Sequence, residues 1–142
     1  MSADLLLDTS AWARLSDESL SPNRVDDIAR ALEERRIAVC LPFLLEAGYS
    51  APNGAEHRKL LNELLTLPLL AIDAKVEGRA IDAQRQLARS GHHRLPPVDL
   101  MMAAIAERHD VGVLHYDSDY DILHAKTDLR FTSVWLAPRG SI

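Results

Sequence analysis

The chain alternates short, continuous apolar runs with longer stretches in which apolar residues recur at helical spacing. Apolar runs bounded by polar turn formers are typical of parallel strands that are buried on both faces. Such runs predict strands at residues 5–7, 37–41, 69–72, 112–116 and 132–136. Helical spacing predicts helices at residues 21–36, from Pro42 onward, at residues 56–67 and 74–88, from Pro97 onward and from Asp121 onward. Strands that alternate with helices indicate an α/β fold, a central parallel sheet flanked by helices.

The first apolar run ends in a carboxylate, Asp8, which is followed by Thr9 and Ser10. In open parallel sheets, ligands bind outside the carboxyl ends of the strands, so Asp8 is expected at the ligand edge. Thr9 or Ser10 is expected to cap the next helix by accepting a hydrogen bond from its free N–H groups. A second interpretation is that Asp8 is itself only the N-cap of that helix.

Other acidic residues follow core elements in the same way. Glu46 lies on the first turns of the helix that begins at Pro42, among apolar neighbours, where an ionised carboxylate is costly unless it is paired, metal-bound or exposed. Asp99 opens a helix whose interior, residues 100–106, is almost wholly apolar, so we expect it at a buried helix start. Asp117 follows the strand at 112–116. Asp8, Glu46, Asp99 and Asp117 are therefore expected to face one sheet edge.

Carboxylates that lie within a few ångströms of one another repel and take up protons unless a cation compensates. Mg²⁺ and Mn²⁺ prefer carboxylate and water oxygens, whereas zinc favours His or Cys at spacings that the six histidines do not show. A metal ion held by acids, with waters retained, suits hydrolysis of a phosphodiester by an activated water. One of the acids would then act as a general base.

Composition narrows the function classes further. A length of 142 residues fits a single domain, residues 1–142. No apolar stretch has bilayer length and the start lacks the pattern of a signal peptide, so we expect a cytoplasmic protein with no membrane partner. Cys40 lies in an apolar run and is expected to be a buried hydrophobe, not a nucleophile.

The net charge of −5 argues against general binding to nucleic acids, because phosphate affinity comes from Lys and Arg. A role on nucleic acid would need metal ions or a local basic patch, for which the candidates are Arg14, Arg89, His92, His93 and Arg94.

Three other families with acidic sites on this architecture fit less well. A haloacid-dehalogenase-type phosphatase needs a second Asp where Ser10 stands. A response-regulator receiver needs an acidic pair at the first strand and a Lys near the fifth strand, and both are missing. A Rossmann or P-loop protein needs a glycine-rich loop after the first strand, and residues 8–11 contain no glycine.

Four motifs in order resemble the PIN-domain ribonucleases, and specifically the VapC toxins of bacterial toxin–antitoxin pairs. They are Leu-Asp-Thr-Ser-Ala at residues 7–11, Glu46, Pro-Val-Asp-Leu at residues 97–100, and Leu-His-Tyr-Asp-Ser-Asp-Tyr at residues 114–120. The closing residues 135–141 also resemble one branch of that family. Much of the family has Thr or Ser where His115 stands, so His115 either helps to bind RNA or replaces a hydroxyl that orients water.

The resemblance implies a PIN-like three-layer fold and Mg²⁺-dependent endonucleolytic cleavage of RNA, with Mn²⁺ as an alternative ion. It implies that Asp8 and Asp99 are metal ligands and that Glu46 and Asp117 complete the acidic cluster, with Asp119 as an alternative fourth carboxylate. It also implies inhibition by a VapB-type antitoxin and a homodimer, for which the helix at residues 60–67 with Phe43 and Tyr49 offers apolar surface. The competing class is a non-catalytic PIN-like interaction module.

Overall fold

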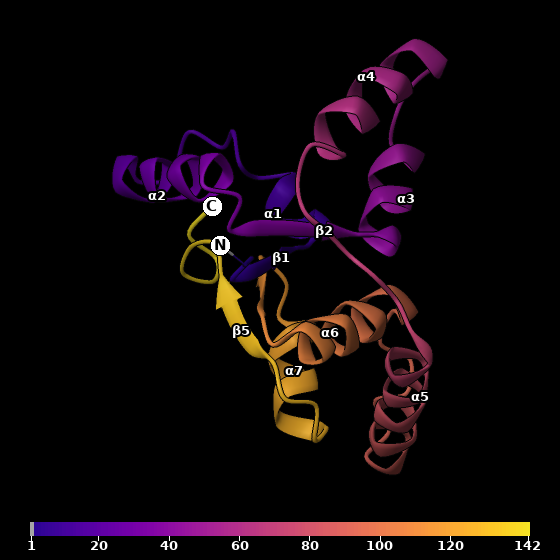
Figure 1. Ribbon diagram of the computed structural model, residues 1–142. Coiled ribbons are helices and arrows are strands. Elements are labelled where there is room, and N and C mark those ends of the chain that lie inside the picture. The colour runs from indigo at the N-terminus through magenta and orange to yellow at the C-terminus, as the bar shows by residue number, and fades with distance from the viewer. Residues whose placement is uncertain (1) are drawn as a thin grey trace.

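The computed structural model describes residues 2–142 as a five-stranded parallel sheet with helices on both faces (Figure 1). The strand order is β3-β2-β1-β4-β5, and every neighbouring pair is parallel. The strands are β1 (Leu5–Leu7), β2 (Ile37–Cys40), β3 (Leu69–Leu70), β4 (Gly112–His115) and β5 (Thr132–Trp135). The predicted α/β fold with a central parallel sheet is confirmed.

The helices divide between the two faces according to which strand precedes them. They are α1 (Thr9–Trp12), α2 (Pro22–Glu33), α3 (Leu41–Tyr49), α4 (Gly54–Leu64), α5 (Ala74–Arg89), α6 (Pro97–His109) and α7 (Asp119–Lys126). In Figure 1, α1, α2 and α4 lie above the sheet and α5, α6 and α7 lie below it, while α3 continues from the carboxyl end of β2. This division is what right-handed crossovers between parallel strands require.

The strand order reverses direction between β1 and β4. From β1 the chain moves to β2 and β3 on one side, and from β4 it moves to β5 on the other. A reversal of this kind separates the connections that leave the two strands, and open α/β sheets bind their ligands in the resulting crevice. The residues that follow β1 and β4, which include Asp8 and Asp117, therefore stand at the switch point.

The hydrophobic core extends over both faces of the sheet, and α6 contributes a large part of it. Leu6 and Leu7 of β1 and all of β2 and β4 are buried. On α6 the buried residues are Leu100 and Met102 to Ala106, as the apolar pattern predicted. Since α6 is covered on nearly all sides, its first turn carries Asp99 into the interior, where that side chain is only 7% exposed.

Several local predictions were wrong for identifiable reasons. The helix predicted at residues 56–67 begins earlier, at Gly54, because Asn53 caps it by accepting a hydrogen bond from the backbone N–H of Glu56. The same helix ends at Leu64, which leaves Leu65 55% exposed. Asp8, and neither Thr9 nor Ser10, caps α1. Ile81 has helical spacing with the apolar residues of the helix predicted at residues 74–88, which favours a buried side chain, but it is 54% exposed because Ala83 and Leu87 form the buried side of α5.

Two further side chains bear on the expected partners and chemistry. Phe43 was predicted to lie on the dimer surface, and this was wrong because its side chain is fully buried. Its ring packs edge-on against the ring of Trp12. Cys40 is buried as predicted, and burial raises the pKa of its thiol to about 12, so it is no nucleophile at neutral pH. Within residues 2–142, no helix is both long enough and apolar enough to cross a membrane.

Candidate metal centre

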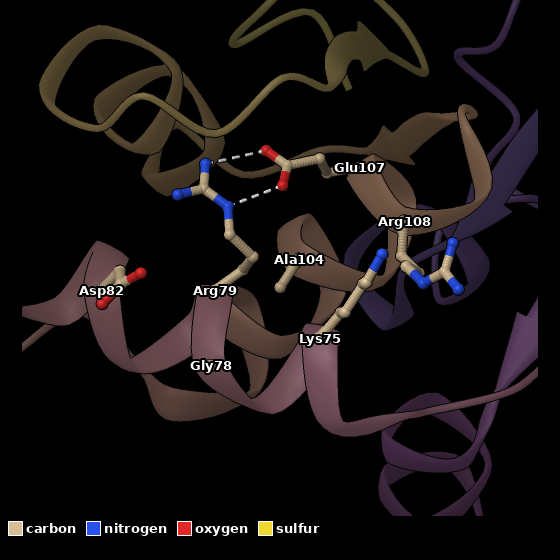
Figure 2. Close-up of a pocket in the computed structure, with 7 residues that line it drawn as sticks. All are labelled: Lys75, Gly78, Arg79, Asp82, Ala104, Glu107 and Arg108. Carbon is tan, nitrogen blue, oxygen red and sulfur yellow. Dashed lines mark hydrogen bonds and ion pairs between the residues drawn. The ribbon is translucent and has the colours of Figure 1, made fainter.

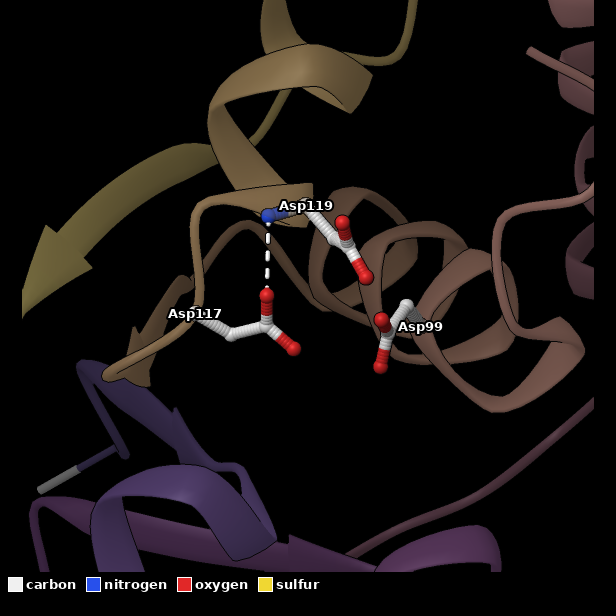
Figure 3. Close-up of side chains that lie close together, drawn as sticks. All are labelled: Asp99, Asp117 and Asp119. Carbon is white, nitrogen blue, oxygen red and sulfur yellow. Dashed lines mark hydrogen bonds between the residues drawn. The ribbon is translucent and has the colours of Figure 1, made fainter.

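Three carboxylates, from α6, from the β4–α7 connection and from the first residue of α7, face one another at the carboxyl edge of the sheet (Figure 3). One oxygen each of Asp99, Asp117 and Asp119 lies within 4.8 Å of the others. Asp117 and Asp119 are half-buried, and the backbone N–H of Asp119 donates to Oδ1 of Asp117 at 2.9 Å. That bond closes a tight turn after β4, which places both side chains beside the start of α6.

Asp8 adjoins this group through the side chain of Tyr120. Its Oδ2 accepts hydrogen bonds from the backbone N–H and the hydroxyl of Ser10, at 3.0 and 2.5 Å. Its Oδ1 accepts from the Tyr120 hydroxyl at 2.7 Å, and the same hydroxyl lies 3.3 Å from Oδ1 of Asp99. Asp8 therefore caps α1 with one oxygen but is not only an N-cap, because its other oxygen is joined to Asp99 through Tyr120.

Two acids of the site, Asp99 and Asp119, lose their proton less readily than an exposed carboxylic acid does. Burial, followed by the charges of Asp8, Asp117 and Asp119, raises the pKa of Asp99 to about 8. Burial and Asp117 also raise the pKa of Asp119. Oδ2 of Asp99 is buried and has no hydrogen-bond partner in the described part of the chain. An oxygen of this kind, beside two more carboxylates and with no His or Cys in the group, fits a hard divalent ion such as Mg²⁺ or Mn²⁺.

Glu46 lies beside Asp8 and outside the group of three. It is exposed on α3, and its Oε1 accepts a hydrogen bond from the hydroxyl of Thr9, the residue after Asp8. Thr9 thus ties α3 to the end of β1 and keeps Glu46 at the same edge of the sheet. Of the four predicted carboxylates, Asp99 and Asp117 belong to the group within 4.8 Å. Asp8 is linked to Asp99 by the Tyr120 hydroxyl, and Glu46 is hydrogen-bonded to Thr9, the residue after Asp8.

Sequence reasoning missed two hydroxyls that hold this arrangement together. Ser10 donates to Asp8 and accepts from the backbone N–H of Tyr116 at 2.9 Å, which links α1 to the end of β4. Tyr120, buried completely, bridges Asp8 and Asp99. The available signal was position alone: Ser10 comes two residues after Asp8, and Tyr120 comes directly after Asp119.

The predicted basic candidates do not form one continuous patch. Arg14 is half-buried, donates to the carbonyl of Ser10 at 2.9 Å and lies over the Tyr116 ring at 4.8 Å. Arg89 ends α5, and Arg94 and His93 are exposed in the loop that leads into α6, with His92 half-buried beside them. That loop immediately precedes Asp99 along the chain.

A hollow of about 430 Å³ lies between α5 and α6, away from the three aspartates, and is lined by side chains of both charges (Figure 2). There Arg79 donates two hydrogen bonds to Glu107, at 2.7 and 3.0 Å. This pairing lowers the pKa of Glu107, the opposite of what happens at Asp99. Arg79 and Glu107 neutralise each other, whereas within residues 2–142 no Lys or Arg forms an ion pair with Asp99, Asp117 or Asp119.

Comparison with known proteins agrees with this geometry. Residues 5–126 match the family described as the PIN domain. The chain belongs to the PIN-domain family. Two relatives of this PIN domain are Ribonuclease VapC51 of Mycobacterium tuberculosis, 38% identical over all of the chain and 99% of the relative, and Ribonuclease VapC2 of the same species, 36% identical over 86% of each.

Solved structures show the same fold at lower sequence identity. A chain in the crystal structure of DNA-bound VapBC from Salmonella typhimurium matches with a TM-score of 0.73 and 16% identity over 95% of this chain and 99% of that one. A chain of VapBC-5 from Mycobacterium tuberculosis, a member of the VapBC family of toxin-antitoxin systems, matches with a TM-score of 0.63 and 23% identity, over 94% and 98%. The predicted PIN-like three-layer architecture is thereby confirmed.

Proposed function

We propose that this PIN domain is a metal-dependent endoribonuclease, the toxin of a type II toxin–antitoxin pair, and that residues 1–142 act as one domain. The observation that carries the proposal is the buried Asp99 carboxylate, with an unpartnered oxygen, among the acids at the switch point of the sheet. Relatives that span nearly the whole chain at 31–38% identity are named ribonucleases, which supports RNA as the substrate. We also propose that the protein acts in the cytoplasm, where its RNA substrate is found.

The proposed roles of the side chains follow from their surroundings. Asp8 and Asp99 hold the ion, which is Mg²⁺ with Mn²⁺ as a substitute, because Tyr120 keeps one oxygen of each fixed relative to the other. Asp117 completes the cluster from the opposite side, with Asp119 as the alternative. When bound, the ion supplies an activated water and neutralises charge on the phosphate. Glu46 is exposed and oriented by Thr9, and its proposed role is that of a general base that accepts a proton from water.

Two kinds of partner fit the surface around the acids. The loop with Arg89, His92, His93 and Arg94 supplies positive groups for RNA phosphates next to Asp99. An apolar groove of about 350 Å³ adjoins Glu46 and suits a protein partner. We assign this groove, lined by Leu41, Pro42, Leu45, Tyr49, Val98 and Met101, to a VapB-type antitoxin that covers the acidic site, since the solved structures named above are VapBC complexes.

A homodimer is the remaining proposed assembly. Tyr49 at the end of α3 is 92% exposed, and Leu65 just after α4 is also exposed. Large apolar side chains that stay exposed mark interaction surfaces when they gather on neighbouring elements. Because α3 and α4 pack against each other, we take these two residues as the proposed dimer face, and Tyr49 lies where this face meets the antitoxin groove.

Cleavage of structured RNA by purified wild type and by Asp99→Asn, each with Mg²⁺ and with chelator, tests the function. We expect wild type with Mg²⁺ to cleave and the other three reactions to fall to background, because Asp99→Asn leaves the ion with one ligand fewer and the fold intact. Asp26→Asn on exposed α2 is the matched control and should cleave like wild type. Equal cleavage in all four reactions would show that the carboxylates are not the active site, and background activity in all four would favour the non-catalytic interaction module.

A further inference from the structure

The side chain of His115, the last residue of β4, is completely buried between two aromatic rings. The ring of Tyr120 lies 4.7 Å away by centroids at an interplanar angle of 32°, and the ring of Trp135 lies 4.9 Å away at 61°. With no exposed surface, the imidazole does not contact RNA. Its position between the two rings leaves it with a single orientation.

The hydrogen bonds of His115 determine which ring nitrogen carries the proton. Nδ1 lies 3.1 Å from the backbone nitrogen of Asp117, whose N–H group can only donate, so Nδ1 accepts and carries no hydrogen. The neutral ring therefore has its hydrogen on Nε2, which lies 2.7 Å from Oγ of Ser133 and donates to it. Ser133 in turn donates to Oδ1 of Asp121 at 3.2 Å.

This chain of donors runs in one direction, from the backbone of Asp117 to the carboxylate of Asp121 on α7. Trp135 adds a further donor, because its Nε1 lies 3.2 Å from both oxygens of Asp121. Within this series, His115 and Ser133 each accept one hydrogen bond and donate another without conflict. Ser133 on β5 and Asp121 on α7 therefore fix the tautomer of His115.

Both halves of the acidic site depend on this imidazole. On one side its Nδ1 holds the backbone of Asp117, whose carboxylate is then oriented by the N–H of Asp119. On the other side its ring supports Tyr120, the residue that bridges Asp8 and Asp99. Among the described residues, no other side chain both hydrogen-bonds to the backbone of Asp117 and forms an aromatic pair with Tyr120.

We propose that His115 is the positioning residue of the metal centre, and that Ser133, Asp121 and Trp135 hold it in the Nε2–H tautomer that the Asp117 backbone requires. The inference rests on the proposed function for its metal ion. It assigns His115 no contact with RNA and none with the ion.

Two substitutions separate the two nitrogens of the ring. In His115→Asn the side-chain oxygen stands where Nδ1 stood and still accepts from Asp117, but the contact with Ser133 is lost. In His115→Gln the terminal amide reaches toward Ser133, while the acceptor for Asp117 is lost. Both remove the ring, so the loss of packing is similar. The readout is the Mn²⁺ dissociation constant without RNA, measured by electron paramagnetic resonance of the free ion.

We expect His115→Gln to weaken Mn²⁺ binding by about tenfold or more and His115→Asn by only about threefold, since groups that orient metal ligands are typically worth about 10- to 100-fold in affinity. His124→Gln, on the exposed side of α7, is the matched control and should bind Mn²⁺ like wild type. Equal losses in the two His115 variants would mean that the ring only fills space, and would overturn the proposal.

Ser133→Ala keeps the test decisive if a His115 variant does not fold. It leaves the core untouched and frees the tautomer, so Mn²⁺ binding should weaken by about threefold, by the same reasoning on groups that orient ligands. Unchanged binding in Ser133→Ala would contradict the proposal. Wild type that binds Mn²⁺ without cleaving RNA would refute the proposed function alone, whereas wild type that binds no Mn²⁺ would refute both.

Discussion

Tyr120 donates a hydrogen bond to Asp8 across 2.7 Å, although 112 residues separate the two along the chain. The bond joins the start of α7 to the end of β1, at the point where the strand order reverses. Tyr120 is fully buried, and burial together with the charges of Asp8 and Asp99 raises the pKa of its hydroxyl well above the usual value. It therefore remains a donor at any working pH.

Tyr120→Phe removes this donor and keeps the ring that packs on His115. We expect RNA cleavage to fall by about tenfold, because a hydrogen bond to a charged group is worth roughly 1.5–3 kcal/mol and both ligating acids lose their shared partner. The measurement is the single-turnover cleavage rate at saturating Mg²⁺. Tyr49→Phe, at an exposed tyrosine, serves as control. A Tyr120→Phe rate equal to that of wild type would show that the bridge is dispensable.

The pKa of Asp99 predicts how stability depends on pH when no metal is bound. Since the pKa of Asp99 is about 8 in the folded protein and its ordinary value is 3.8, the folded protein holds a proton that the unfolded chain releases between these two pH values. Stability is therefore fully present below the lower value and is lost as pH rises toward the upper one, by at most about 1.4 kcal/mol per pH unit.

Asp99→Asn should lack this dependence and, in chelator, should be the more stable protein at about pH 8, because an amide carries no charge to repel its neighbours. Urea unfolding of both proteins at several pH values gives the comparison. Saturating Mg²⁺ should restore the stability of wild type at this pH, because the ion binds only the folded state. A constant difference between the two proteins from about pH 5 to about pH 8 would contradict the assignment.

The fourth carboxylate is expected to be Asp117 and not Asp119. Asp117 is fixed by two hydrogen bonds, one from its backbone to His115 and one from Asp119 to its Oδ1, so its other oxygen is preorganised. Asp117→Asn should therefore weaken Mn²⁺ binding more than Asp119→Asn does, as titration calorimetry would report. The reverse order would assign the role to Asp119.

RNA binding should depend on the loop that precedes α6. Replacing Arg89 and Arg94 together with Gln should weaken binding and lower the slope of log affinity against log salt by about 1.4, because each phosphate contact on single strands contributes about 0.7. Fluorescence anisotropy with Ca²⁺ in place of Mg²⁺ measures this without cleavage. The paired control, Arg30→Gln with Arg58→Gln on exposed positions of α2 and α4, should leave the slope unchanged. If the first pair also leaves it unchanged, the assignment fails.

The proposed dimer face should be sensitive to Tyr49 and Leu65. We expect wild type to sediment as a dimer at micromolar concentration and Tyr49→Ser with Leu65→Ser to sediment as a monomer, since the paired surfaces lose apolar area. Ile81→Ser, an equally exposed apolar position on α5, should remain dimeric. A wild-type monomer would remove the dimer from the proposal.

The sequence by itself determined the sheet and the placement of its acids. Strands buried on both faces must be continuously apolar, so residues 5–7 and 112–115 were recognisable, and parallel strands put Asp8 and Asp117 at one edge. Asp99 was recognisable for a similar reason, because a helix with an interior as apolar as that of α6 packs in the core and buries the acid of its first turn. These features depend on local pattern and on general rules of chain topology.

Only the tertiary structure decided how the acids are held and which faces remain exposed. The partners of Tyr120 lie 112 and 21 residues away, and those of His115 include Ser133 on a neighbouring strand. A hydroxyl or an imidazole has no sequence pattern that names its acceptor, since the acceptor is whichever group the packed core brings within about 3 Å. The same holds for Ile81 and Phe43, whose exposure depends on how each helix is rotated against the sheet, and helical spacing alone does not fix that rotation.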